Sequence, residues 1–261
     1  MADMFIFGLG YSAKVIKRSL ESIGWRVVST GRDGDFRFDD ESAVRAALGV
    51  ASHVLSSVPP DGDADPVLES YGDALGDVWL GYLSSSGVYG DAGGAWVDES
   101  APTGGGRRTA RAACDSAWLE RDARVLRLPG IYGPGRSALD RVRQGKARRI
   151  DMPGQVFSRI HVEDIAAGLV AALDGPPGAY NLGDDLPASQ NAVIEEACRL
   201  LGSVPPPLQT LEEADLSPMA RGFYAENRRV ANGKAKRVLG WRPRYPTYRE
   251  GLRALAGRSS P

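Results

Sequence analysis

The stretch FIFGLGYSA at residues 5–13 decides the fold. A short apolar segment runs into the pattern G-x-G-x-x-A, which places Gly8, Gly10 and Ala13 at its three small positions. The first glycine permits a tight turn, the second lets a pyrophosphate approach the backbone at a helix N-terminus, and a small third residue lets that helix lie close on a sheet. Because the motif follows a strand and opens a helix, it predicts a dinucleotide-binding turn rather than an ordinary strand-turn-helix.

The first half of the chain alternates apolar strand-like segments with amphipathic helical ones. The expected strands cover residues 4–8, 26–30, 53–58, 78–84 and 125–128, and the expected helices cover 12–23, 40–48, 66–75 and 109–121. Strands that alternate with crossover helices form a parallel sheet. The pattern therefore predicts an α/β fold with a doubly wound parallel sheet of the NAD(P)-binding Rossmann type.

Beyond Gly130 the regular alternation ends, and glycine and proline cluster up to Gly135. A short helix at 138–145 and an extended stretch at 150–162 follow, whereas a helix at 162–173 and a strand at 179–182 would return the chain to the main sheet. We therefore expect a Rossmann domain at 1–129, rejoined by 160–182. A smaller C-terminal substrate lobe is expected from 130–159 and 183–261.

The composition excludes several functional classes. The 261 residues include 32 Lys+Arg and 33 Asp+Glu, 43% are hydrophobic and 25% are charged, which is typical of a globular protein. A net charge of −1 favours neither nucleic acid nor a membrane surface as a partner. Cys114 and Cys198, with His53 and His161, have no spacing for a disulfide framework or a metal site, so no metal is expected. The strand-like start and the short longest apolar run, 165–173, predict neither a signal peptide nor a membrane span, and favour the cytoplasm.

The end of the second strand bears on the choice of cofactor. The sequence VVSTGR at 27–32 has Thr30 where NAD-binding folds commonly carry an acidic residue, and Arg32 follows. An arginine there accommodates the 2′-phosphate, so NADP is favoured, with NAD as the alternative. Asp33 either pairs with Arg32 or takes the acidic role itself, and a solvated surface arginine is the plain alternative for Arg32.

Seven segments in order along the chain resemble the extended or atypical short-chain dehydrogenase/reductase superfamily, in particular its NAD-dependent epimerase/dehydratase-like branch. They are residues 8–13, HVLSSVPP at 53–60, LSSSGVYG at 83–90, RLPGIYGPG at 127–135, FSRIHVEDIA at 157–166, YNLG at 180–183 and GWRPRYPTYREGL at 240–252. The resemblance implies a small-molecule substrate and a homodimer that packs two helices of each copy into a four-helix bundle. The expected cofactor-binding residues are Gly8, Gly10, Tyr11, Ser12, Ala13, Thr30, Arg32, Ser57, Val58, Pro59, Pro129, Gly130 and Ile131.

In that family, the serine or threonine four residues before the tyrosine of V-Y-G binds the reacting oxygen of the substrate. The matching residue here is Ser85, and its neighbours Ser84 and Ser86 take its place if the register differs by one. Serines that only satisfy backbone groups of a turn are the alternative.

The acid-base pair Tyr-x-x-x-Lys of the family is absent, because no tyrosine lies four residues before any of the five lysines. If Asp115 matches the acidic residue that follows on the same helix, the two positions fall on Arg107 and Arg111. Arginine stays protonated, so Arg107 cannot exchange a proton as a tyrosine does. Arg111 retains the capacity to hold a ribose or a phosphate, and a solvated basic helix face is the alternative for both.

Further candidates lie in the remaining motifs. Tyr89 and Tyr132 are candidate replacement acids if a nearby cation lowers their pKa, although packing is the commoner role of such tyrosines. An arginine binds the diphosphate of nucleotide sugars in relatives, and Phe157 stands at that position. Arg159, two residues further on, either takes that role or the substrate has no diphosphate. His161 is interpreted as structural.

The sequence thus predicts an NADP-dependent oxidoreductase or epimerase-like enzyme. Its expected substrate is small and polar, and an anionic substrate is one alternative. The predicted catalytic residues are Ser85, Arg107, Arg111 and Tyr132, and the predicted substrate-binding residues are Ser86, Tyr89, Arg136 and Arg159. A non-catalytic NADP-binding sensor or scaffold is the alternative that the missing Tyr-Lys pair favours. A binding protein for an unrelated small molecule is disfavoured by the intact glycine turn.

Overall fold

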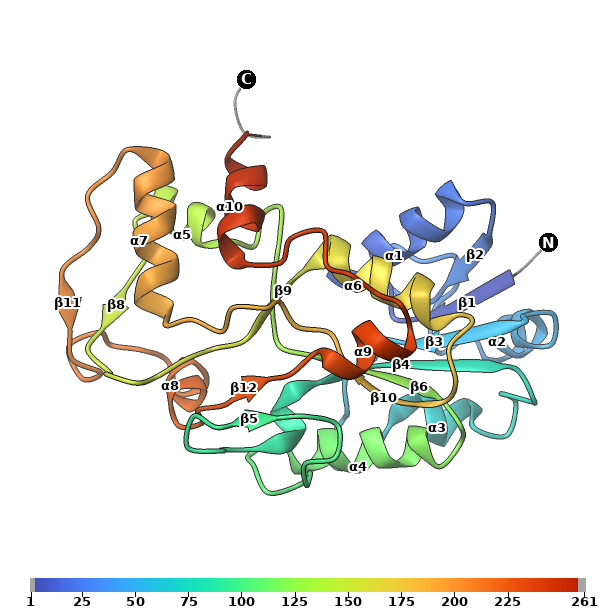
Figure 1. Cartoon of the computed structure of the whole chain (residues 1–261). Helices are drawn as coiled ribbons and strands as arrows, with labels where there is room; N and C mark the ends of the chain where they lie inside the picture. The colour runs from blue at the N-terminus through green and yellow to red at the C-terminus, as the bar shows by residue number, and fades with distance from the viewer. Residues whose placement is uncertain (1–2, 258–261) are drawn as a thin grey trace.

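The computed structural model of the chain describes residues 3–257. Its centre is a six-stranded sheet in the order β10-β6-β4-β3-β1-β2, in which all neighbouring strands run parallel (Figure 1). The strands are β1 (Asp3–Phe7), β2 (Arg26–Ser29), β3 (His53–Ser56), β4 (Trp79–Ser85), β6 (Arg124–Leu128) and β10 (Gly178–Asn181). The predicted doubly wound α/β fold is confirmed.

Helices cover both faces of this sheet. They are α1 (Tyr11–Ser22) and α6 (Val162–Ala172) on one face, and α2 (Glu41–Leu48), α3 (Pro66–Tyr71) and α4 (Thr109–Leu119) on the other. Successive side chains of a strand point to opposite faces, so Met4 and Ile6 pack with α1 and α6 while Phe5 and Phe7 pack with the other three helices. A strand buried on both faces explains why residues 4–7 are uninterruptedly apolar.

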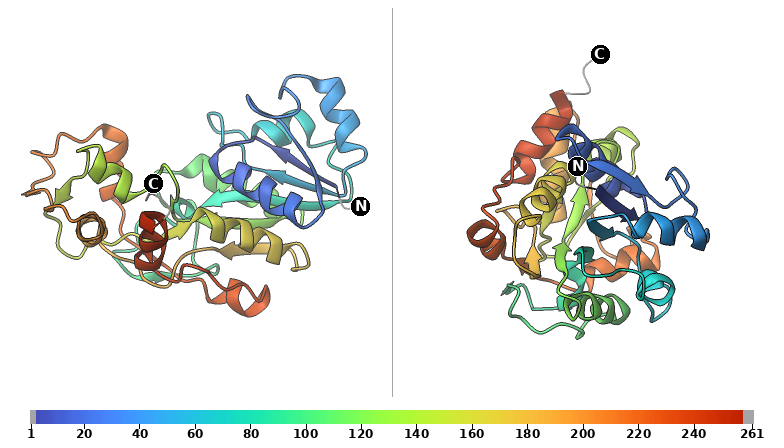
Figure 2. Two further views of the ribbon diagram at one scale, coloured as in Figure 1. Left: turned by 90° about the horizontal axis from the view of Figure 1, so that it is seen from above. Right: turned by 90° about the vertical axis from the view of Figure 1, so that its right-hand side faces the viewer.

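A second group of helices forms the smaller lobe. It comprises α5 (Ala138–Arg143), α7 (Gln190–Leu201) and α10 (Tyr248–Gly257), which bury an apolar cluster that includes Leu139, Val193 and Leu252. The short strands β8 (Arg149–Ile150) and β11 (Leu208–Gln209) pair beside it. Figure 2 shows this group at one end of the molecule, beyond the carboxyl ends of the sheet strands.

Two short strand pairs and three short helices lie between the two parts. The strands β7 (Gly130–Tyr132) and β9 (Arg159–His161) pair in parallel, as do β5 (Trp96–Val97) and β12 (Arg229–Val230). The 3-10 helix η1 (Ser86–Tyr89) follows β4, whereas α8 (Pro218–Tyr224) and α9 (Gly233–Val238) flank β12. Neither the pairing of β5 with β12 nor the helices α8 and α9 were expected from the sequence, and α10 begins inside the motif at 240–252 without having been predicted as a helix.

Segments from late in the sequence return to the main sheet. Strand β10 forms one edge of that sheet beside β6, and Ala235 and Trp241 are buried in the same core cluster as Met4. The boundaries proposed for the two domains stay a prediction. No helix within residues 3–257 is long and apolar enough to cross a membrane.

Candidate active site

A cavity of about 1130 Å³ is lined by residues at the carboxyl ends of the strands and by residues of the smaller lobe. Its wall includes the start of α1, the end of β4 with η1, the start of α4 and the turn from β6 into β7. The small lobe closes it with residues of α5, α7, α8 and α10. Ligands of open α/β sheets bind at this edge of the sheet, so the cavity is the candidate active site.

The glycine turn at the cavity has the geometry that its sequence predicts. Gly8 has φ 82°, and its N–H donates to Thr30 Oγ1 at 3.0 Å. A Cβ on Gly8 would lie 3.1 Å from Val58 Cγ2 and 3.2 Å from Ser57 Oγ, so a side chain there would be both strained and crowded.

Gly10 is the N-cap of α1, and no side chain among the described residues caps that helix. A Cβ on Gly10 would meet nothing within 4 Å, so open space lies beside the uncapped amide groups. Uncapped N–H groups at a helix N-terminus attract anions, and the residues present therefore fit a pyrophosphate. Tyr11, Ser12, Ala13 and Ser57 line the cavity next to it.

The residues predicted to bind the adenosine half of the cofactor lie outside the cavity wall. Thr30, Arg32, Val58 and Pro59 do not line the cavity, whereas Pro129, Gly130 and Ile131 do. Arg32 is exposed and makes no hydrogen bond or ion pair within residues 3–257. The carboxylate of Asp33 pairs with Lys14 at 2.5 Å, and this hydrogen bond lowers the pKa of Asp33. The pair between Asp33 and Arg32, one of the two sequence alternatives, is not formed.

The three serines after β4 have separate roles. Ser84 donates to Asp115 Oδ2 at 2.6 Å, in the protein interior. Ser85 caps η1 and accepts a hydrogen bond from the N–H of Gly87 at 3.1 Å, which leaves its own hydroxyl proton to donate into the cavity. Ser86 is buried and lines the cavity. Ser85 thus both satisfies a backbone N–H of the turn and lies at the site.

Tyr89 and Tyr132 do not lie as the sequence analysis predicted. Tyr89 is not part of the cavity wall, because its hydroxyl donates to Asn181 at 2.8 Å and accepts from Arg127 at 3.0 Å in the interior. The ring of Tyr132 borders the cavity, but its buried hydroxyl has no hydrogen-bond partner among the described residues and lies against Gly251. Burial raises the pKa of Tyr132. These positions do not favour a substrate-binding role for Tyr89 or a proton-donor role for Tyr132, and both roles stay predictions.

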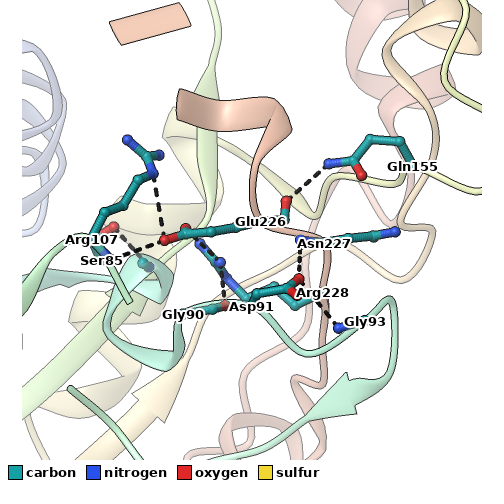
Figure 3. Close-up of polar contacts among 10 residues, drawn as sticks. Ser85, Gly90, Asp91, Gly93, Arg107, Gln155, Glu226, Asn227 and Arg228 are labelled. Atoms are coloured by element: carbon teal, nitrogen blue, oxygen red, sulfur yellow. Dashed lines mark hydrogen bonds and ion pairs between the residues drawn. The ribbon is translucent and has the colours of Figure 1, made fainter. Parts of the chain in front are cut away.

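Arg107 and Arg111 both reach the cavity wall. Glu226 accepts from the backbone N–H of Arg107 at 3.2 Å and lies 3.4 Å from its Nε, as Figure 3 shows. The Nη1 of Arg111 donates to the Tyr82 hydroxyl at 2.7 Å. These internal partners do not agree with a simply solvated basic face.

Arg159 is a buried cation in the wall of the cavity, with 7% of its surface exposed. Its Nη1 donates to the carbonyls of Phe157 and Ala188 at 2.8 and 2.9 Å, and its Nη2 to Gln190 Oε1 at 3.0 Å, so all three acceptors are uncharged. Burial lowers the pKa of Arg159 to about 10, which leaves it protonated near neutral pH. Arg136, the other predicted substrate-binding arginine, also lines the cavity and lies 5.6 Å from the Tyr11 ring.

His161 is buried and caps α6, because its Nδ1 accepts from the Glu163 N–H at 3.2 Å. This structural role confirms the sequence interpretation. No group of three His, Cys, Asp or Glu side chains within residues 3–257 could hold a metal ion.

Several lining residues escaped the sequence analysis. They include Arg108, Arg141, Lys146, Arg148, Tyr224 and Glu226. Arg108 lies between Arg107 and Arg111, so its position in the sequence could have indicated that it lines the site. The segment around Glu226 carries no motif that could have indicated this. The cavity is lined by nine basic side chains, Arg107, Arg108, Arg111, Arg136, Arg141, Lys146, Arg148, Arg159 and Arg228, against three acidic ones, Asp140, Asp215 and Glu226.

Asp184, close to Arg159, gives the molecule an unusual dependence of stability on pH. Burial raises the pKa of this carboxyl from 3.8 to about 7, and its Oδ2 has no hydrogen-bond partner among the described residues. The folded state therefore binds more protons than the unfolded state between these values, and stability falls as the pH rises through the window. We expect Asp184→Asn to abolish this fall and to exceed the wild type by about 2–4 kcal/mol at pH 8. Urea unfolding at pH 4.5 and pH 8 measures the free energy of unfolding of both proteins. An equal loss of stability in the wild type and in Asp184→Asn between these pH values would contradict the prediction.

Taken together, the parallel sheet, the glycine turn and the cavity at the strand ends define a Rossmann-type fold. No family model matches the chain. A 3-diazoavenalumate denitrifying reductase of Streptomyces sp is 35% identical over 140 residues, which cover 49% of this chain. The match spans 45% of that reductase, so it covers less than half of the relative's length.

Solved structures cover the whole fold. A functionally unknown conserved protein from Silicibacter pomeroyi is 41% identical over 100% of both chains, with a TM-score of 0.87. The UDP-glucose 4-epimerase of Thermus thermophilus, in complex with NAD, is 21% identical over 98% of this chain and 99% of its own, with a TM-score of 0.75. The human epimerase family protein SDR39U1, with NADPH, is 16% identical over 97% and 99%, with a TM-score of 0.76.

The structures with NAD and NADPH are 21% and 16% identical to this chain, and their likeness shows that the chain shares their fold.

Proposed function

We propose that the protein is an NADP-dependent reductase that acts on a small anionic organic substrate. The observation that carries this proposal is the cavity itself. It joins an uncapped helix N-terminus at Gly10 to the hydroxyl of Ser85 and to a lobe lined mainly by basic side chains. Such a wall favours negatively charged ligands at both ends.

The cofactor half rests on backbone groups. The uncapped N–H groups of α1 would hold the pyrophosphate, Pro129 to Ile131 would lie at the nicotinamide, and Arg32 would contact the 2′-phosphate. A nicotinamide coenzyme supplies hydride exchange when it is bound there. Arg32 supports NADP because its guanidinium is exposed, while Asp33 is held by Lys14.

The substrate half rests on Ser85 and Arg159. Ser85 would donate its hydroxyl proton to the reacting oxygen, since Gly87 already occupies a lone pair of Ser85 Oγ. Arg159 would bind an anionic group, because its guanidinium is buried beside uncharged acceptors and the neighbouring Asp184 is half-protonated near pH 7. The name of the Streptomyces reductase agrees with the proposed class of reaction.

The second candidate function is a non-catalytic NADP-binding sensor. The missing Tyr-Lys pair favours it, and so does the burial of the Tyr132 hydroxyl. The two functions differ in one result. A reductase consumes NADPH with some member of a panel of 2-oxo acids and unsaturated carboxylic acids, whereas a sensor binds NADPH and consumes none.

The first test is a pair of fluorescence titrations with NADPH and NADH. We expect NADPH to bind more tightly than NADH by about 10- to 100-fold, the worth of one or two hydrogen bonds to a charged group. Arg32→Ala should remove this difference by weakening NADPH alone. The control is Arg37→Ala, which removes a cation that pairs with Asp39 on the same exposed segment. If neither nucleotide binds at millimolar concentration, the proposed function is wrong.

A further inference from the structure

Arg108 lies beside Ser85, across a gap that Gly87 leaves open. A Cβ on Gly87 would lie 2.5 Å from Cδ of Arg108, 3.1 Å from its Nε and 3.2 Å from Ser85 Oγ. The guanidinium stem and the hydroxyl therefore border the same small volume, and both residues line the cavity. The φ of Gly87 is not in the left-handed region, so space rather than backbone conformation makes glycine the suitable residue there.

The charge of Arg108 is not neutralised by a hydrogen-bonded carboxylate within residues 3–257. Glu226, the acidic side chain nearest this part of the wall, binds Arg107 and, at 2.9 Å, Arg228 (Figure 3). The Phe223 ring also lies near Arg108, with its centroid 5.9 Å from the guanidinium carbon. Burial, together with the repulsion of Arg107 and Arg111, lowers the pKa of Arg108.

We propose that Arg108 and Ser85 together bind the reacting oxygen of the substrate and stabilise the negative charge that it acquires. The inference rests on the proposed function. When a carbonyl carbon gains a hydride, a C–H bond forms, the π electron pair moves to the oxygen, and an oxyanion results. A guanidinium and a hydroxyl that converge on that oxygen stabilise it electrostatically.

The proton that completes the reduction comes from water in this scheme. Arg108 cannot supply it, because a guanidinium does not release its proton near neutral pH. The arrangement therefore accounts for a reductase without Tyr-x-x-x-Lys. It favours conjugated carbonyls that take the hydride at the β carbon, because the C=C π pair then shifts toward the carbonyl carbon, the carbonyl π pair moves to the oxygen, and a weakly basic enolate results. Simple ketones are disfavoured, because their alkoxides need a proton at once.

The test measures the chemical reactivity of single arginines in the whole protein saturated with NADP. Phenylglyoxal modifies arginine, and mass spectrometry of peptides gives the rate at each position. Acetate is the probe, because its carboxylate presents the charged oxygens that the proposed site binds. We expect acetate to slow the modification of Arg108 by about fivefold or more, as a charge-assisted hydrogen bond would. Exposed Arg121, at the other end of α4, is the internal control and should react at an unchanged rate.

Two variants test the pair itself. Ser85→Ala removes the second donor, and Gly87→Ala forces the Arg108 stem away from Ser85, so both should abolish the acetate effect at Arg108. The result for Gly87→Ala is interpreted only if this variant still unfolds cooperatively with temperature. If it does not, Ser85→Ala alone tests the inference. An acetate effect that is absent in the wild type, or undiminished in Ser85→Ala, overturns the inference. If NADP binds and Arg108 is unprotected, only this inference is wrong, whereas a failure to bind NADP refutes the proposed function.

Discussion

Replacement of Asp115 by alanine is expected to destabilise the fold by about 3–5 kcal/mol. Asp115 is fully buried, and its two carboxylate oxygens accept from Arg127 at 2.6 and 3.0 Å. Ser84 donates to the same carboxylate, and Arg127 donates to the Tyr89 hydroxyl, so the network joins α4 to β4, β6 and η1. The substitution leaves Arg127, which is 4% exposed, as an unpaired charge in the interior.

A double variant separates the loss of the pair from the burial of a lone charge. Asp115→Ala combined with Arg127→Leu should be more stable than Asp115→Ala alone, because no uncompensated cation remains. Urea unfolding measures all three proteins, with Glu120→Ala at the exposed end of α4 as the control. A loss below about 1 kcal/mol for Asp115→Ala would mean that water reaches Arg127 in the native state.

The fold was predictable because its signals are local. Residues 4–7 alternate between the two apolar clusters of the sheet, and Gly8, with its positive φ, marks where β1 must turn. Each of these features needs only a few neighbouring residues, so a sequence displays it without knowledge of the rest of the chain. The start of α3 at Pro66 was predicted, and Asp65 caps it there, whereas its end lies at Tyr71 rather than at the predicted residue 75.

The arrangement of side chains at the site was less predictable, because it depends on distant segments. Tyr89 lies in a motif next to Ser85, yet its hydroxyl is held by Asn181, 92 residues later in the chain. Likewise, Tyr132 abuts Gly251, and Glu226 reaches Arg107 from a segment without any motif. Sequence neighbours could place these residues near the site but could not show the direction in which each side chain points.

The dependence on distant segments also explains why the sequence did not indicate a role for Arg108. Spacing from Asp115 puts Arg107 and Arg111 at the positions of the family's acid-base pair, and it gives Arg108 no role. The structure places Arg108 at the N-cap of α4 beside Gly87 and Ser85, whereas Arg107 is held by Glu226. Which arginine lies beside Ser85 depends on the space at Gly87, and this space is visible only in the folded structure.

Gly10→Asp is expected to have opposite effects on the free protein and on its cofactor complex. Gly10 is the N-cap of α1, has φ −83° and has open space where a Cβ would lie, so an aspartate fits without strain. An aspartate at an N-cap accepts hydrogen bonds from the first turn, and relative to the glycine that it replaces it stabilises a helix by about a few tenths of a kcal/mol. The free variant should therefore unfold at the same temperature as the wild type or a higher one.

The same carboxylate would occupy the N–H groups that we assign to the pyrophosphate, and its charge would repel the cofactor. We expect the affinity for NADPH to fall by more than about 100-fold, equivalent to about 2.7 kcal/mol, and the thermal stabilisation by NADPH to vanish. Gly10→Asn, which caps the helix without the charge, separates repulsion from occupancy and should lose less affinity than Gly10→Asp. If Gly10→Asp still binds NADPH like the wild type, the pyrophosphate does not lie at the start of α1, and the cofactor must then be sought along the basic wall formed by the smaller lobe.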